Sequence, residues 1–199
     1  MSTWIFDFDG TLTNVDLGRE FSNWMFKSGR VGFKGRLMRL CGAPINVILR
    51  RVDVGQRLLA WSFGISDVDR RSSFVDFLLE FDDQIIVNHE VMNLLHGSRE
   101  NFRVLITGCH EELAKMFLQR RGINDFDEII GMRLRNSFLI SMHPYGRTKT
   151  KLSKQYEPYI GVGDSWADRY FLKRATSAVV VDRDSRLVDL ARQRGWNVV

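Results

Sequence analysis

The sequence has only two cysteines and three prolines, and it has no apolar run that approaches the length needed to span a bilayer. Cys41 and Cys109 lie far apart and show no metal-ligand spacing, which favours two reduced thiols over a disulfide or a zinc pair. Internal repeats and low-complexity segments are also absent. Since no signal peptide is recognisable before the first apolar segment, we expect a cytoplasmic protein.

Length and charge set further limits. The chain has 199 residues, of which 44% are hydrophobic and 27% charged, enough for one globular core and a small appended unit. The net charge is +5, but residues 17–60 alone carry nine basic and two acidic residues, or +7, which leaves about −2 for the remainder. This uneven distribution suits an anionic ligand, although a solvated helical surface is the alternative.

The most informative stretch is Trp4 to Thr13, WIFDFDGTLT. An apolar run that is typical of a buried strand ends at Asp7 and Asp9, whose carboxylates would point to the same side and repel each other. A divalent cation such as Mg²⁺ would offset that repulsion, since it prefers oxygen ligands. Gly10 would allow a tight turn and close approach of a ligand. An ordinary Asp-Gly turn after a strand is the alternative.

The string DFDGTLT resembles the first signature of the haloacid dehalogenase (HAD) superfamily of phosphatases. This resemblance implies an α/β fold, a Rossmann-like, doubly wound parallel sheet with the catalytic loop at the carboxyl end of the first strand. It also implies three further signatures in a fixed order.

Residues 14–101 are predicted to form an inserted helical cap of the C1 type, and residues 1–13 and 102–199 the catalytic core. Apolar residues in this insertion recur at three- and four-residue spacing, and the insertion resembles the cap of the phosphoserine phosphatase-like branch, subfamily IB. In that branch a Glu that binds the substrate amine stands where this chain has Asp16, and a carboxylate-binding Arg stands near Arg50 and Arg51. A helix N-cap for Asp16 and surface solvation for the arginines are the alternatives.

The second and third signatures are shorter. Val104 to Ile106 predicts a strand that leads to Thr107 and Gly108, which resemble the hydroxyl and amide donors that hold phosphoryl oxygens in the family. Lys149 best matches the lysine that the family places at the start of a helix to offset the charge of nucleophile and phosphate. Lys151 and Lys154 are alternatives for that role.

The segment YIGVGDSWADRYFL resembles the fourth signature. An apolar strand leads to Asp164, and Asp168 follows four residues later, so one carboxylate could bind Mg²⁺ directly while the other supports it. The alternative is a helix N-cap with an acidic first turn. The resemblance implies a Mg²⁺ site formed by Asp7, Asp9 through its backbone carbonyl, Asp164 and Asp168.

Together these signatures imply a Mg²⁺-dependent phosphatase that acts on a small phosphorylated metabolite. Asp7 would be the nucleophile and form an aspartyl-phosphate, and Asp9 would act as the general acid and base. The phosphate would be held by Gly10, Thr107, Gly108 and Lys149.

Other functions remain open at this level. A phosphotransferase could use the same chemistry. A membrane-associated lipid-phosphate phosphatase is suggested by apolar residues interleaved with basic ones, although a cap core with a solvated rim is favoured; the apolar residues are Trp24, Met25, Phe26, Phe33, Leu37, Met38 and Leu40. A non-catalytic binding module is disfavoured because the predicted catalytic residues are intact. No nucleic-acid reading motif is recognisable, and the sequence predicts no oligomeric state.

Overall fold

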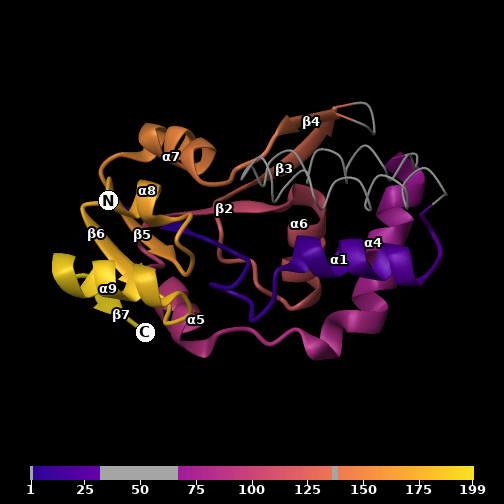
Figure 1. The fold of residues 1–199 in the computed structure, drawn as a ribbon, viewed down its shortest axis with the longest axis horizontal. Helices are drawn as coiled ribbons and strands as arrows, with labels where there is room; N and C mark the ends of the chain where they lie inside the picture. The colour runs from indigo at the N-terminus through magenta and orange to yellow at the C-terminus, as the bar shows by residue number, and fades with distance from the viewer. Residues whose placement is uncertain (1, 32–66, 136–138) are drawn as a thin grey trace.

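The computed structural model describes residues 2–31, 67–135 and 139–199 of the chain. These residues contain a seven-stranded sheet in the order β4-β3-β2-β1-β5-β6-β7 (Figure 1). Strand β4 is antiparallel to β3, and all other neighbours are parallel. The strands are β1 Thr3–Phe6, β2 Phe102–His110, β3 Glu128–Arg135, β4 Leu139–Met142, β5 Tyr159–Gly163, β6 Ser177–Val180 and β7 Asn197–Val198.

Helices pack against both faces of this sheet. The helices fall into two groups, and each group contributes residues to its own apolar cluster. The first group is α1 Leu17–Lys27, α4 Asp67–Phe81, α5 His89–Gly97 and α6 Glu111–Arg120. The other group is α7 Arg147–Ser153, α8 Arg169–Leu172 and α9 Ser185–Arg194. Two short 3-10 helices are η1 Asp82–Gln84 and η2 Lys154–Tyr156. The predicted α/β, Rossmann-like doubly wound fold is confirmed.

Strand β1 lies at the centre of the sheet, which explains its apolar sequence. Ile5 belongs to the cluster on one face and Phe6 to the cluster on the other, and both are fully buried. Phe6 is in register with Leu105 of β2 on one side and Val162 of β5 on the other. A parallel strand buried on both faces must be apolar throughout, so the first polar residues after it stand at the carboxyl end of the sheet.

The predicted cap contains α1 and α4, which lie on the opposite side of the molecule from the N-terminus (Figure 1). The two helices meet through aromatic rings: the Phe21 ring lies 4.7 Å from Phe74 and 5.5 Å from Phe77 between centroids. The same apolar cluster continues into core residues such as Phe8 and Phe117. The division of the chain at residues 14–101 stays a prediction.

Of the residues that suggested a lipid-facing surface, the structure describes Trp24, Met25 and Phe26. Trp24 and Met25 are buried in the apolar cluster, so these two side chains pack inside the protein. Phe26 packs partly against it. The others lie outside the described residues, as do Cys41, Arg50 and Arg51. Within the described part of the chain, no helix combines the length and apolar character needed to cross a membrane.

Two elements differ in their bounds from the sequence prediction. Strand β2 continues past Thr107 to His110, with an irregular register against β3 in its last residues. Helix α7 begins at Arg147 after Gly146, whose φ is +53°, so the helix starts two residues before Lys149. Both differences shift boundaries only, and the predicted order of elements is retained.

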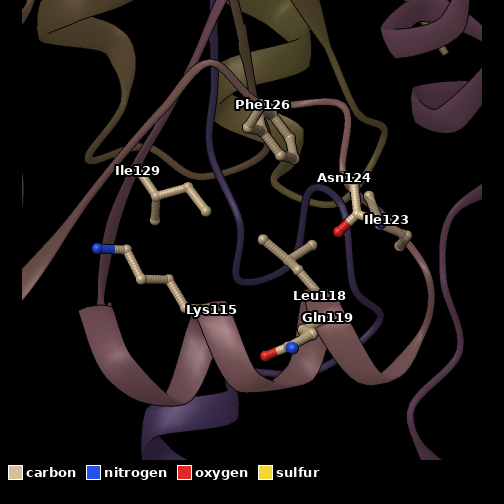
Figure 2. A pocket seen from close by; sticks show the side chains of 7 residues that line it. All are labelled: Lys115, Leu118, Gln119, Ile123, Asn124, Phe126 and Ile129. Atoms are coloured by element: carbon tan, nitrogen blue, oxygen red, sulfur yellow. The ribbon is translucent and has the colours of Figure 1, made fainter.

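A surface hollow of about 310 Å³ opens beside α6 (Figure 2). It is lined by three residues of α6, among them Lys115, and by residues between Ile123 and Ile129. The ammonium group of Lys115 is paired with Glu111 at 2.6 Å. None of the predicted site residues lines this hollow.

Candidate active site

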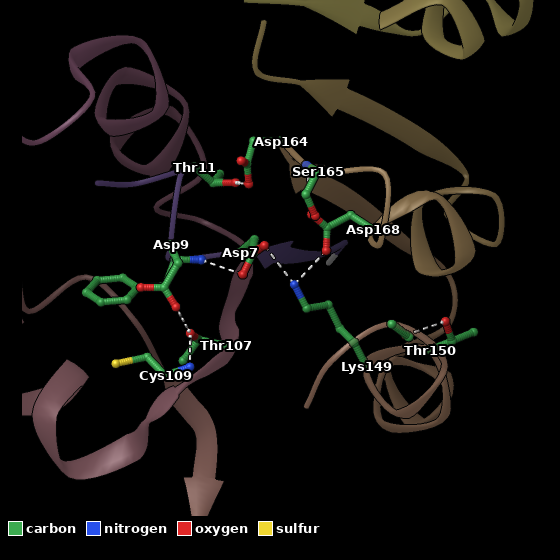
Figure 3. A network of polar contacts seen from close by, with 12 residues as sticks. Asp7, Asp9, Thr11, Thr107, Cys109, Lys149, Thr150, Asp164, Ser165 and Asp168 are labelled. Carbon is green, nitrogen blue, oxygen red and sulfur yellow. Dashed lines mark hydrogen bonds and ion pairs between the residues drawn. The ribbon is translucent and has the colours of Figure 1, made fainter. Parts of the chain in front are cut away.

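The carboxyl ends of β1 and β5 and the first turns of α7 bring three charged side chains together (Figure 3). The Lys149 ammonium lies 2.8 Å from Oδ2 of Asp7 and 2.7 Å from Oδ1 of Asp168. All three side chains are buried. Lys151 and Lys154 are exposed, so Lys149 is the lysine that the fold places in this cluster.

Asp9 follows Asp7 by two positions, but its carboxyl group has different partners. Its Oδ1 accepts a hydrogen bond of 2.7 Å from the backbone N–H of Leu17, and its Oδ2 accepts one of 3.2 Å from the Thr107 hydroxyl. Burial and the nearby Asp16 carboxylate raise the pKa of Asp9 to about 8. Asp9 is therefore mostly protonated at neutral pH and can supply a proton.

The pKa values of the two carboxylates that share Lys149 are shifted in opposite directions. Burial would raise the pKa of Asp168, but Lys149 and the Ser165 hydrogen bonds outweigh it and hold that pKa below its ordinary value. Burial and the neighbouring Asp168 raise the pKa of Asp7 well above its ordinary value, and Lys149 only partly opposes this. Because ionised Asp7 is costly in this cluster, additional positive charge near it would be favourable.

Asp7, Asp164 and Asp168 form an acidic triad, in which each residue offers one carboxylate oxygen that lies within 4.8 Å of those of the other two. Burial and the nearby Asp168 raise the pKa of Asp164 to about 6. Oδ1 of Asp164 accepts a hydrogen bond of 2.8 Å from the Thr11 hydroxyl. Three crowded carboxylates with one lysine fit a divalent cation such as Mg²⁺ in donor type and in charge.

The individual ligand roles differ within this group. Asp168 uses Oδ1 for Lys149 and Oδ2 for the N–H and hydroxyl of Ser165, at 3.1 and 2.8 Å, so it is better suited to support a cation than to bind it directly. The Asp9 carboxyl is not part of the triad. The role of the Asp9 backbone carbonyl as a metal ligand, which the resemblance implies, stays a prediction.

Gly10 lets the first loop approach Asp164 closely. Its φ is +80°, and a Cβ at this position would lie 2.2 Å from Oδ2 of Asp164. No other residue type fits here without displacing that carboxylate. Gly10 thus fixes the distance between the loop after β1 and the loop after β5.

The remaining predicted site residues are placed in different ways. The Thr107 hydroxyl contacts Asp9 and also accepts a 2.9 Å hydrogen bond from the Cys109 N–H, which holds the Thr107–Cys109 segment beside the acid. Gly108 lies between them. Asp16 caps α1 by accepting a hydrogen bond of 2.8 Å from the Arg19 N–H, which is the alternative role that the sequence left open.

Sequence reasoning did not assign Thr11, Ser165 or Tyr145 to the site. Thr11 and Ser165 both lie inside the quoted signatures, and each is a small hydroxyl residue near an acidic one, which could have indicated a carboxylate partner. Tyr145 had no such signal. It is brought to the site by the loop before α7, and the charges of Asp168, Lys149 and Asp7 act on its pKa.

Comparisons with solved structures agree with this fold. A protein of unknown function from Bordetella pertussis Tohama I matches with a TM-score of 0.81 at 15% identity, covering 100% of this chain and 98% of that chain. A phosphoserine phosphohydrolase-like protein from Francisella tularensis subsp. tularensis SCHU S4 matches with a TM-score of 0.62 at 15% identity, covering 100% and 95%. A probable phosphoserine phosphatase from Vibrio cholerae matches with a TM-score of 0.67 at 12% identity, covering 100% and 60%.

Sequence comparison gives the family. A search of curated protein sequences found no match. The family model for haloacid dehalogenase-like hydrolases matches residues 4–173, which include most of β1, Asp9, Thr107, Lys149 and the acidic triad. Since this match covers most of the chain and all of the clustered residues, the chain belongs to the haloacid dehalogenase-like hydrolase family.

Proposed function

We propose that this hydrolase is a Mg²⁺-dependent phosphomonoesterase that forms an aspartyl-phosphate on Asp7. The observation that carries the proposal is the contrast between Asp7, which contacts Lys149 at 2.8 Å, and Asp9, whose pKa is raised to about 8. One carboxylate is thus placed beside a cation, as a nucleophile needs, and the other holds a proton, as a general acid needs.

In the first step a carboxylate oxygen of Asp7 attacks phosphorus, and the bond from phosphorus to the leaving oxygen breaks. Asp9 gives its proton to that oxygen, so the leaving group departs as a neutral alcohol. Lys149 and the Thr107 hydroxyl are the residues suited to stabilise the phosphoryl oxygens, with the backbone N–H groups of Gly10 and Gly108 as further donors.

In the second step Asp9, now ionised, takes a proton from a water molecule that attacks phosphorus. The bond from Asp7 to phosphorus breaks, and inorganic phosphate and ionised Asp7 are formed. Asp9 regains its proton, so the cycle closes with no net change in the protein. The hydrogen bond that Asp9 accepts from the Leu17 N–H keeps its carboxyl in one position for both steps.

Mg²⁺ would be held by Asp7, Asp164 and the backbone carbonyl of Asp9, with Asp168 in support. When bound, it would supply positive charge that lowers the pKa of Asp7 and offsets the charge of the phosphoryl group. The acidic triad and the raised pKa values of Asp7 and Asp164 support this assignment.

The substrate is proposed to be a small phosphorylated metabolite. Two alternatives use the same residues and are distinguished by products. A phosphotransferase would pass the phosphoryl group to an acceptor other than water, and a lipid-phosphate phosphatase would prefer a phospholipid. A dehalogenase of the same family would need no general acid, because a halide ion leaves without a proton. The protonated Asp9 therefore favours an ester whose leaving group is an oxygen atom.

The test is release of inorganic phosphate from a panel of phosphoserine, sugar phosphates and a lysolipid phosphate, with chloride release from a 2-haloacid measured in parallel. We expect phosphate release that is lost in Asp7→Asn and in EDTA. The matched control is Asp189→Asn, which removes an exposed carboxylate on α9 and should leave turnover unchanged. Full turnover by Asp7→Asn, or chloride release alone, would contradict the proposal.

A further inference from the structure

The segment Thr107–Cys109 is contacted by three parts of the chain. One of them, the loop that carries Tyr145, has no part in the proposed mechanism. Thr107 holds the general acid Asp9. Beside Cys109 packs the start of α1: a Cβ on Gly18 would lie 3.7 Å from Cys109 Cα and 3.6 Å from Oδ1 of Asp16. Gly108, between them, faces the loop before α7, where a Cβ would lie 3.5 Å from Nε2 of His143 and 3.9 Å from Cδ2 of Tyr145.

Tyr145 is held in place by its surroundings. Its ring stacks on the His143 ring at 5.8 Å between centroids with an interplanar angle of 7°. The backbone N–H of Tyr145 donates to the His143 carbonyl at 2.8 Å, and its carbonyl accepts from the Thr148 N–H at 3.0 Å, which connects it to the helix that carries Lys149. The start of α7 therefore positions both the Tyr145 backbone and Lys149.

The side chain of Tyr145 nevertheless remains 40% exposed. Partial burial raises the pKa of its phenol, and the charges of Asp168, Lys149, Asp7 and Asp16 also act on that pKa, so the hydroxyl stays protonated at neutral pH. A protonated phenol can both donate and accept a hydrogen bond. The phenol is therefore a donor that a bound molecule can reach, and it feels the charges of Asp7, Lys149 and Asp168.

Because the Thr107 hydroxyl contacts Oδ2 of Asp9, a leaving group that receives its proton from Asp9 is expected near the Thr107–Cys109 segment. There it has Asp16 on the α1 side of the segment and Tyr145 on the α7 side. Asp16 is an acceptor of hydrogen bonds and disfavours an anionic substituent. Tyr145 adds a donor and an apolar ring edge, a combination that suits a carbon chain bearing hydroxyl groups.

We propose that Tyr145 is a specificity-determining residue whose hydroxyl donates a hydrogen bond to an oxygen of the leaving group, and that it favours phosphate esters of small polyhydroxylated alcohols. This inference rests on the proposed phosphomonoesterase function. His143 acts through Tyr145, as a positioning residue that holds the ring parallel to its own.

The test compares two probe esters that differ only in hydroxyl groups, glycerol 3-phosphate and propyl phosphate. We expect the wild-type protein to have the higher kcat/KM for glycerol 3-phosphate. Tyr145→Phe keeps the ring and removes the hydroxyl, so it should reduce the ratio of the two kcat/KM values about threefold to tenfold, which is the effect of one neutral hydrogen bond. The loss should fall on glycerol 3-phosphate, while propyl phosphate keeps its wild-type value.

The control is Tyr156→Phe, which removes the hydroxyl that donates to Glu128 at 2.6 Å and should leave the ratio unchanged. A wild-type protein that turns over both esters equally, or a Tyr145→Phe variant that keeps the wild-type ratio or loses both activities equally, would overturn the inference while the phosphatase activity stands. A wild-type protein that releases phosphate from no ester would instead reject the proposed function, and the inference with it.

Discussion

Lys149 illustrates how one side chain can serve both stability and chemistry. It is fully enclosed with Asp7 and Asp168, and these carboxylates raise its pKa further above the ordinary lysine value even though burial opposes this. The ion pairs do not need to add net stability to be essential, because removal of the cation leaves two buried carboxylates without a charged partner.

We predict that Lys149→Met lowers the free energy of unfolding by about 3–5 kcal/mol in EDTA, which is the usual effect of breaking a buried ion pair. Urea denaturation measures it, with Lys151→Met as the control on the exposed side of the same helix. Added Mg²⁺ should recover part of the loss by pairing with the carboxylates that have lost the lysine. Equal stability of the two variants in EDTA would argue against this account of the cluster.

His110 at the end of β2 gives a prediction for pH. Burial and the nearby Arg70 lower its pKa from 6.5 to about 3, and its ring lies 5.4 Å from Phe74 between centroids. The folded protein therefore holds His110 neutral, whereas the unfolded chain takes up a proton below pH 6.5. The stabilising contribution is complete above pH 6.5 and decreases as the pH falls toward 3.

The measurement is urea unfolding of the wild-type protein and His110→Asn at pH 7.5 and pH 5.0. Between these values the wild-type protein should lose about 2 kcal/mol more than the variant, since each pH unit below 6.5 contributes about 1.4 kcal/mol. Other titrating groups, including the raised carboxyls of the site, are common to both proteins and cancel in the difference. Parallel pH profiles would show that His110 does not carry this dependence.

At the scale of elements, the loop after β1 is connected to two other segments. Asn14 pairs with Ile86, its backbone N–H donating to the Ile86 carbonyl at 2.9 Å and its Oδ1 accepting from the Ile86 N–H at 2.8 Å. Arg183, in the loop between β6 and α9, donates to the carbonyls of Gly10 at 3.1 Å and Asn14 at 2.7 Å. These contacts hold the loop that presents Thr11 and Gly10 to Asp164.

We predict that Arg183→Met raises the Mg²⁺ concentration needed for half-maximal activity about tenfold, because the loop beside Asp164 is no longer fixed. Arg183 is exposed, so the free energy of unfolding should change by less than about 1 kcal/mol. Arg183→Lys should recover only part of the effect, since a lysine cannot bridge two carbonyls as a guanidinium does. An equal change in Arg192→Met, an exposed arginine of α9, would rule out a role for the loop.

The elements also show what sequence could predict. The string around Asp7 and Asp9 predicts a buried strand that ends in carboxylates, because its apolar run and its acidic residues allow few other structures. The Asp164 and Asp168 pair and a lysine at the start of a helix were predicted because the order of signatures limits the choices, but only burial in the structure separates Lys149 from Lys151 and Lys154. Arg183 and Tyr145 were not predicted, since they reach the site only through the packing of β6, α7 and the first loop. No spacing along the chain indicates that they lie near the site.

At the scale of the whole molecule, the acidic triad links metal binding to the stability of the fold. Asp7 follows β1, and Asp164 and Asp168 follow β5, so a cation held by these residues binds the folded chain and not the unfolded one. Its binding free energy then adds to the free energy of unfolding. In the metal-free protein, burial of these carboxylates and repulsion within the triad act against folding, as the raised pKa values of Asp7 and Asp164 indicate.

We therefore predict that Mg²⁺ raises the melting temperature relative to EDTA and that the rise grows with the logarithm of its concentration. At one hundred times the dissociation constant the gain is about 2.7 kcal/mol, or roughly 5–10 °C for a chain of this length. Asp164→Asn should remove most of this rise, and because it relieves repulsion in the triad, it should melt no lower than the wild-type protein in EDTA. Asp189→Asn, with its carboxylate on the surface of α9, should respond to Mg²⁺ as the wild-type protein does. A melting temperature that is independent of Mg²⁺ in the wild-type protein would mean that the triad holds no cation under these conditions, whereas a rise that persists in Asp164→Asn would place the cation elsewhere.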